Sequence, residues 1–93
     1  MVEYIDANTT NRYVIDRSFV DDGVRWIIDY KSSQPQENQT LASFLQQQSH
    51  RYLAQLKAYR SIVQTWQGHD HSDVIKTALY FPAIDVLHEV AVM

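Results

Sequence analysis

The sequence contains no cysteine, only two glycines and two prolines, and no long apolar run. The lack of cysteine excludes disulfides and thiolate metal sites. No segment approaches the roughly 20 apolar residues that a membrane-spanning helix needs. Polar residues at Glu3, Asp6 and Asn8 interrupt any signal-peptide pattern at the start. We therefore expect a cytoplasmic protein without a membrane partner.

Positive charge is also scarce, with 8 Lys and Arg against 11 Asp and Glu and a formal net charge of −3. This balance argues against a generally basic nucleic-acid binder, but not against an enzyme that contacts nucleic acid through a local cleft. A length of 93 residues allows one small domain with a marginal core. We treat residues 1–93 as that domain and, from the abrupt start, expect a fragment of a longer chain.

The segment from Arg12 to Lys31 predicts two strands joined by a tight turn. Asp22-Gly23 favours a type I′ turn, because both central residues of that turn need positive φ. With these two residues as the loop, Asp16 lies opposite Asp29 and shares its face. Strand alternation adds Lys31 to the same face. Opposed carboxylates destabilise a hairpin unless a cation lies between them, so the pair suggests a cation site.

The register of this hairpin has one alternative. A three-residue loop that includes Asp21 would pair Asp16 with Ile28 and send the two carboxylates to opposite faces. We favour the two-residue loop because it gives one apolar and one polar face. The apolar face, expected to be buried, carries Tyr13, Ile15, Arg17, Phe19, Val24, Trp26, Ile28 and Tyr30. The polar face carries Val14, Asp16, Ser18, Val20, Arg25, Ile27, Asp29 and Lys31.

The rest of the chain predicts one long helix and further strands. Apolar residues recur at helical spacing from Leu41 to Gln67, with Thr40 as N-cap and Gly68 placed to end the helix. We expect strands at residues 2–5, 74–81 and 85–92, a turn at 6–10, and loops at 32–40 and 69–73. A helix between two strands is a crossover that lays the later strand beside an earlier one. The expected fold class is therefore α/β, with a mixed sheet and a helix packed on it.

Asp16, Asp29 and Lys31 have the chemistry of a metal-dependent phosphodiesterase. Mg²⁺ binds carboxylate oxygens and keeps several waters, so two acidic side chains and a backbone carbonyl suffice to anchor it. Such a metal polarises a phosphoryl oxygen and lowers the pKa of bound water. A lysine on the same face can orient that water or offset developing charge. The alternative interpretation is an ordinary Asp–Lys pair on a solvated face.

The expected helix adds the pattern Tyr52-x-x-Gln55-x-x-x-Tyr59. Gln55 and Tyr59 are four residues apart and share a face of the helix. An amide and a phenol can hydrogen-bond phosphate oxygens or hold a metal-bound carboxylate in place. The alternative is that both tyrosines are core aromatics and that Gln55 lies at the edge of the apolar stripe.

In their order and spacing these residues resemble the RecB-type nuclease domain of the PD-(D/E)XK superfamily. That domain forms the C-terminal part of bacterial exonuclease V β-subunits and of related UvrD/Rep-like helicase–nucleases. The resemblance covers about residues 12–82. The matching segments are Ile15-Asp16-Arg17, Trp26-Ile27-Ile28-Asp29-Tyr30-Lys31, Tyr52-x-x-Gln55-Leu56-x-x-Tyr59 and Ala78-Leu79-Tyr80-Phe81-Pro82.

The resemblance implies a restriction-endonuclease-like sheet, truncated at its N-terminus, that hydrolyses DNA with Mg²⁺ or Mn²⁺. Asp16, Asp29 and the carbonyl of Tyr30 would bind the metal, Lys31 would be the catalytic lysine, and Gln55 and Tyr59 would be the helix motif. Family members usually place a further metal-binding His, and often a Glu, on helices upstream of the first strand, and this chain begins too late to contain them.

The resemblance further implies a role in DNA repair and recombination within an ATP-dependent helicase–exonuclease, with DNA, the rest of the helicase chain and its complex subunits as partners. The main alternative is a non-catalytic DNA-binding or structural module of the same fold, inactive because the upstream metal ligands are missing. A protein-interaction domain is a third. A truncated sheet edge could also pair two copies of the chain as a homodimer.

Overall fold

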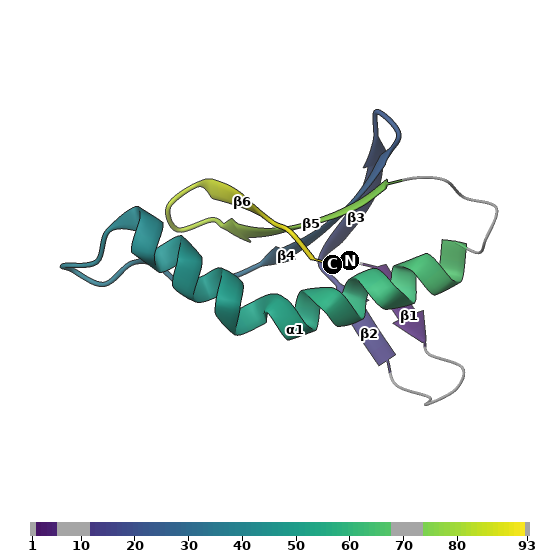
Figure 1. The fold of residues 1–93 in the computed structure, drawn as a ribbon, viewed down its shortest axis with the longest axis horizontal. Helices are drawn as coiled ribbons and strands as arrows, with labels where there is room; N and C mark the ends of the chain where they lie inside the picture. Colours follow the sequence, from purple (N-terminus) through teal and green to yellow (C-terminus); the bar gives the residue numbers. More distant parts are fainter. Residues whose placement is uncertain (1, 6–11, 68–73, 93) are drawn as a thin grey trace.

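The structure is a computed structural model that describes residues 2–5, 12–67 and 74–92 (Figure 1). The elements are β1 (Val2–Ile5), β2 (Arg12–Ile15), β3 (Arg17–Asp21), β4 (Val24–Tyr30), α1 (Leu41–Gln67), β5 (Val74–Phe81) and β6 (Val86–Val90). The strands predicted at residues 2–5 and 74–81 and the helix predicted from Leu41 to Gln67 are confirmed. The last strand is shorter than the predicted 85–92. The expected turn at 6–10, helix end at Gly68 and loop at 69–73 lie outside the described residues.

The fold is mixed α/β, as predicted. Four strands form one sheet in the order β3-β4-β5-β6, and β1 and β2 form a separate antiparallel pair. Strand β5 lies parallel to β4, whereas the β3–β4 and β5–β6 pairs are antiparallel. The helix α1 is the crossover between the two parallel strands and runs along one side of the sheet (Figure 1). None of the helical residues in the described segments forms a stretch long and apolar enough to cross a membrane.

The tight turn between β3 and β4 has the predicted geometry. Asp22 and Gly23 have φ of 50° and 75°, as a type I′ turn requires. The strand register pairs Asp21 with Val24 and Arg17 with Ile28. The two-residue loop is therefore confirmed and the three-residue alternative is wrong. Continued by one residue, the register places Asp16 opposite Asp29.

The continuous hairpin predicted from Arg12 onward is wrong in one respect, because the first strand bends at Asp16. In the register of β3 and β4, the next hydrogen-bonded pair would join the Tyr30 N–H to the Ile15 carbonyl. Instead, the Tyr30 N–H donates to Asp16 Oδ2 at 2.8 Å. The side chain thus ends the backbone ladder, and β2 turns away to pair with β1.

The bend also corrects the predicted faces of the hairpin. Strict alternation placed Ile15 on the buried face and Ile27 on the polar one. In the structure both side chains are fully buried in one cluster, because the bend at Asp16 rotates the preceding strand out of phase. The face expected to be polar is the one that α1 covers, and it carries the buried Asp29. Tyr30, expected to be buried, is 44% exposed.

The core beneath α1 consists of two apolar clusters along the helix. One cluster joins the C-terminal half of α1 to β2 and β4 and contains Ile15, Ile27, Tyr59, Ile62 and Val63. The other joins the N-terminal and central parts of α1 to β5 and β6 and contains Phe44, Leu56, Leu79, Phe81 and Val90. Burial of these side chains fixes the helix on the sheet. Because the two clusters already hold α1 on the sheet, the residues of α1 that lie between them can be polar.

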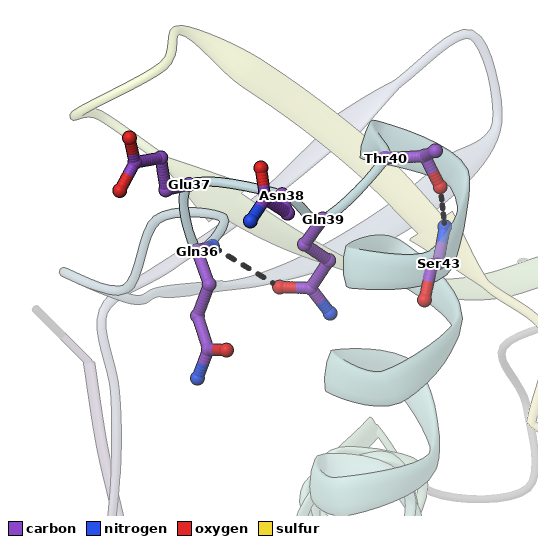
Figure 2. Close-up of a pocket in the computed structure, with 6 residues that line it drawn as sticks. All are labelled: Gln36, Glu37, Asn38, Gln39, Thr40 and Ser43. Carbon is purple, nitrogen blue, oxygen red and sulfur yellow. Dashed lines mark hydrogen bonds between the residues drawn. The ribbon is translucent and has the colours of Figure 1, made fainter.

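The N-terminus of α1 is capped as the sequence predicts. The Ser43 N–H donates to Thr40 Oγ1 at 3.1 Å, and the Phe44 N–H donates to the Thr40 carbonyl at 3.0 Å. Figure 2 shows this cap and the preceding loop, in which the Gln36 N–H donates to Gln39 Oε1 at 3.2 Å. The cap satisfies an N–H that the first helical turn leaves free, so it fixes where the helix begins.

Candidate active site

A buried ion pair lies on the helix-covered face of β4. Lys31 Nζ is 2.7 Å from Asp29 Oδ2, and the two side chains are 17% and 6% exposed. The residues are two apart at the end of the strand, so strand alternation points both side chains toward α1. Asp29 Oδ2 has no well-aligned hydrogen bond from the described residues, so the short contact with Lys31 is its main charge compensation.

The helix motif completes a chain of polar contacts from this ion pair. Lys31 Nζ donates to Gln55 Oε1 at 3.2 Å, and Gln55 Nε2 donates to the Tyr59 hydroxyl oxygen at 2.8 Å. The ammonium has only donors, so the oxygen of the amide must face it and the nitrogen must face the phenol. The Tyr59 oxygen thus accepts one hydrogen bond, which leaves its own O–H proton to donate into the site.

Asp16 approaches the site from the bend between β2 and β3. Its Oδ2 accepts the Tyr30 N–H, and this bond fixes the carboxylate beside the end of β4. The Tyr30 side chain points away, and its ring packs edge-on against Tyr80 with centroids 5.4 Å apart. Among the contacts of Tyr30, only that of its backbone N–H therefore belongs to the site.

Two groups in the site have raised pKa values. Burial raises the pKa of Asp29, the Lys31 ammonium counteracts this, and the neighbouring Asp16 carboxyl raises it further. Burial likewise raises the pKa of Tyr59, with a smaller opposing effect of the Gln55 hydrogen bond. Tyr59 is therefore a neutral donor at physiological pH. The Asp29 carboxyl holds a proton more readily than an exposed aspartate, because it is desolvated and faces a second carboxyl group.

The donor set fits a hard divalent cation. Asp16 and Asp29 offer neighbouring carboxylate groups, and Asp29 Oδ2 is buried without a well-aligned hydrogen bond. Such oxygens, together with a backbone carbonyl and water, are what Mg²⁺ binds. In the residues that the structure describes, no third His, Asp or Glu side chain joins the pair. The protein would thus supply two carboxylates and the Tyr30 carbonyl, with water for the remaining positions.

The structure brings together all five predicted site side chains, Asp16, Asp29, Lys31, Gln55 and Tyr59, in connected contacts. The surface depression in Figure 2 contains none of them, since it is lined by Gln36, Glu37, Asn38, Gln39, Thr40 and Ser43 at the start of α1. The candidate site is thus the polar junction of β4 and α1, between the two apolar clusters.

Sequence reasoning missed two features of this junction. Tyr52, interpreted as part of the helix pattern or as core, lies under Lys31, with the ammonium 3.9 Å from the ring centroid. The bond from the Tyr30 N–H to Asp16 was also missed. Tyr52 could have been found from its spacing to Gln55, which places both on one side of the helix. The bend at Asp16 has only a weak signal, the low preference of aspartate for strand interiors.

Comparisons of the chain with protein-family models, with curated proteins and with solved structures return no match.

Proposed function

We propose that this domain hydrolyses DNA phosphodiester bonds with Mg²⁺ at the junction of β4 and α1. The observation that carries the proposal is the buried Asp29–Lys31 ion pair, with Asp16 beside it and Gln55 and Tyr59 behind it. A buried salt bridge is weak evidence of a stabilising role, because desolvation offsets its Coulomb energy. A buried carboxyl group with a raised pKa, such as that of Asp29 next to Lys31, is instead typical of functional sites.

Each residue has a separate task in this proposal. Asp16 and Asp29 bind the cation, which supplies a polarised phosphoryl oxygen and a water of lowered pKa. Lys31 offsets the charge that develops on the phosphoryl group or orients the attacking water. Gln55 fixes the ammonium through its amide oxygen and orients Tyr59 through its amide nitrogen. Tyr59 donates its O–H proton to a carboxylate or to a phosphate oxygen.

The fold and the family resemblance of the sequence extend the proposal to the larger protein in which this domain would act. A hairpin, a crossover helix and a parallel strand are compatible with the restriction-endonuclease-like sheet of RecB-type nucleases, which the ordered motifs of the sequence resemble. In that reading the domain is part of a helicase–nuclease that acts in DNA repair or recombination. Manganese would substitute for magnesium, because both bind the same oxygen ligands.

The test is cleavage of end-labelled linear single-stranded DNA with Mg²⁺ or Mn²⁺. Wild type is compared with Asp29→Asn and with Glu89→Gln, a matched neutralisation of an exposed carboxylate that pairs with Lys76 at 3.6 Å. We expect cleavage by wild type and Glu89→Gln, no cleavage by Asp29→Asn, and none in EDTA. Equal cleavage by all three would locate the activity elsewhere, including in a contaminant.

If wild type does not cleave, the same comparison is made in a longer chain with residues added upstream. Cleavage there, sensitive to Asp29→Asn, would place further metal ligands in the added residues. Continued inactivity with bound DNA would overturn the nuclease proposal in favour of a non-catalytic DNA-binding module of this fold.

A further inference from the structure

The Lys31 ammonium has three close neighbours among the described residues. Asp29 Oδ2 lies at 2.7 Å, Gln55 Oε1 at 3.2 Å, and the centroid of the Tyr52 ring at 3.9 Å. The contact with Gln55 is a hydrogen bond, whereas the Asp29 carboxylate compensates the charge of Lys31 without a well-aligned hydrogen bond. Lys31 can act with its full charge on a phosphate or a water only if this carboxylate has another cation to compensate it.

Asp29 is the partner that would give way under the proposed function. Its carboxylate binds the cation in that proposal, and a carboxylate shared with a divalent ion attracts an ammonium less strongly. The other two partners, Tyr52 and Gln55, both come from α1 and lie three residues apart, on one side of the helix. They can hold the ammonium while one of its donors becomes available.

Tyr52 is well placed for this task because its ring is itself fixed. The ring is half-buried and packs against the apolar cluster that contains Phe44 and Leu79. The Lys31 side chain above it is only 17% exposed. Cation–π attraction grows as water is removed from the cation, so this contact is stronger than the same pair on an open surface.

A ring also has a chemical advantage over a second acidic partner. It attracts the ammonium through its quadrupole but offers no carboxylate oxygen to the metal. A carboxylate at the same position would compete for the cation and would keep Lys31 neutralised. The ring thus holds the charge of Lys31 in the site without cancelling it.

We infer that Tyr52 is a positioning residue, whose ring face keeps the Lys31 ammonium in the site when Asp29 turns to the metal. The catalytic consequence of this inference rests on the proposed function, whereas the contact between the Lys31 ammonium and the Tyr52 ring does not. The positioning role of Tyr52 depends on its ring and not on its hydroxyl. The structural alternative is that Tyr52 only fills the apolar cluster.

Two variants separate the role of the ring from that of apolar packing. Tyr52→Phe keeps the ring, whereas Tyr52→Leu keeps an apolar side chain but removes the ring. We expect Tyr52→Phe to cleave within about twofold of wild type, and Tyr52→Leu to lose about tenfold in kcat with little change in KM, as expected for one desolvated cation–π contact. Tyr80→Leu is the control, because Tyr80 is a half-buried tyrosine that hydrogen-bonds Asp85 and packs against Tyr30 on the other face of the sheet.

A second measurement does not depend on activity. In a carbon–proton correlation spectrum of labelled protein, the Lys31 side-chain CH₂ protons next to Nζ should be shifted upfield by the Tyr52 ring, relative to those of the exposed Lys57. The shift should persist on addition of Mg²⁺, remain in Tyr52→Phe and disappear in Tyr52→Leu. Melting curves of all variants establish that each is folded.

The outcomes separate the inference from the proposed function. An unchanged Lys31 shift in Tyr52→Leu, or cleavage by Tyr52→Leu equal to that of Tyr52→Phe, would overturn the role of the ring. Loss of the shift on Mg²⁺ addition would overturn it as well, since the ring would then not hold the displaced ammonium. Inactivity of wild type and of the longer chain, together with the expected shifts, would overturn the nuclease proposal and its catalytic consequence, while it would support the ring as the anchor of Lys31.

Discussion

Two lysines on opposite faces of the sheet have the same kinds of neighbours in different surroundings. Lys31 lies 2.7 Å from Asp29 and 3.9 Å from the Tyr52 ring. Lys76 lies 3.6 Å from Glu89 and 5.7 Å from the Trp26 ring. The side chains of the first pair are 17% and 6% exposed, and those of the second are 44% and 52% exposed. The same three chemical groups thus form a tight site under α1 and a loose one on the open face.

The difference shows what the covering helix does to a lysine–carboxylate pair. Under α1 the carboxylate is desolvated, the pKa of Asp29 is raised, and a third partner, Gln55, fixes the ammonium. On the open face water screens both charges, and an ion pair of that kind contributes little. Burial therefore makes the first pair costly to maintain and sensitive to its surroundings, which is what a reactive site requires.

The largest difference between the two lysines should be in catalysis. Under the proposed function, Lys31→Ala should reduce kcat by about 10²–10³-fold, because it removes a charged group from the reacting phosphate. Lys76→Ala should stay within about twofold of wild type, since an exposed pair contributes little. Initial rates of single-stranded DNA cleavage at saturating substrate measure both. Similar losses in the two variants would remove the functional distinction between the faces.

The next largest difference between the two lysines should be in their contribution to the free energy of unfolding. Without metal at pH 7.5, Lys31→Met should lower the free energy of unfolding by about 3 kcal/mol, because Asp29 stays buried without its counter-charge. Lys76→Met should cost less than about 0.5 kcal/mol. Urea unfolding followed by tryptophan fluorescence gives both values.

The stability difference should also depend on pH, with a definite sign. The folded-state pKa of Asp29 lies above its ordinary value. The cost of ionising the buried carboxyl is therefore present above that folded pKa and disappears as the pH falls through it. The deficit of Lys31→Met should shrink as the pH falls from 7.5 toward acid, whereas that of Lys76→Met should not change. A deficit that grows toward acid would contradict the assignment.

A smaller effect is expected from metal binding. At tenfold its dissociation constant, Mg²⁺ should add about 1.4 kcal/mol to the stability of wild type. Asp29→Asn should lose this gain and Glu89→Gln should keep it. The gain should weaken toward acid pH, because protons compete with the cation for Asp29. Thermal melts with and without Mg²⁺, at pH 8 and pH 6, measure these changes.

The smallest effect belongs to the exposed pair itself. A double-mutant cycle of Lys76→Ala and Glu89→Ala should give a coupling free energy below about 0.5 kcal/mol. The coupling should vanish in 1 M salt, where the Debye length falls to about 3 Å. A coupling that survives high salt would mean that the open face is covered in solution, which would remove the contrast.

Local sequence signals predicted most of the elements. Thr40 as N-cap and the spacing of apolar residues identified Leu41–Gln67, and Asp22-Gly23 identified the turn and hence the register. These signals are reliable because each acts over a few residues, through a capping bond, a helical period or a positive φ. The register in turn brought Asp16 opposite Asp29, so the carboxylate pair was predictable.

The environment of the carboxylate pair was not predictable in the same way. Alternation assigned Asp29 to a polar face, but α1 covers that face and Asp29 is 5% exposed. Alternation also separated Ile15 from Ile27, which the bend at Asp16 brings together. Alternation states which residues share a face only while a strand stays regular, and it does not state which face a helix covers.

By itself, the sequence determined the long helix, the tight turn, the parallel-strand crossover and the residue types available for a cation site. Only the tertiary structure decided which distant residues contact one another. The Asp16 carboxylate accepts a hydrogen bond from the Tyr30 N–H, 14 positions away. The Lys31 ammonium donates to Gln55, 24 positions away, and lies over the ring of Tyr52. The physical reason is one of range. Turns and caps form from neighbouring residues, whereas the charge, burial and hydrogen bonding of the site arise where α1 packs across β4.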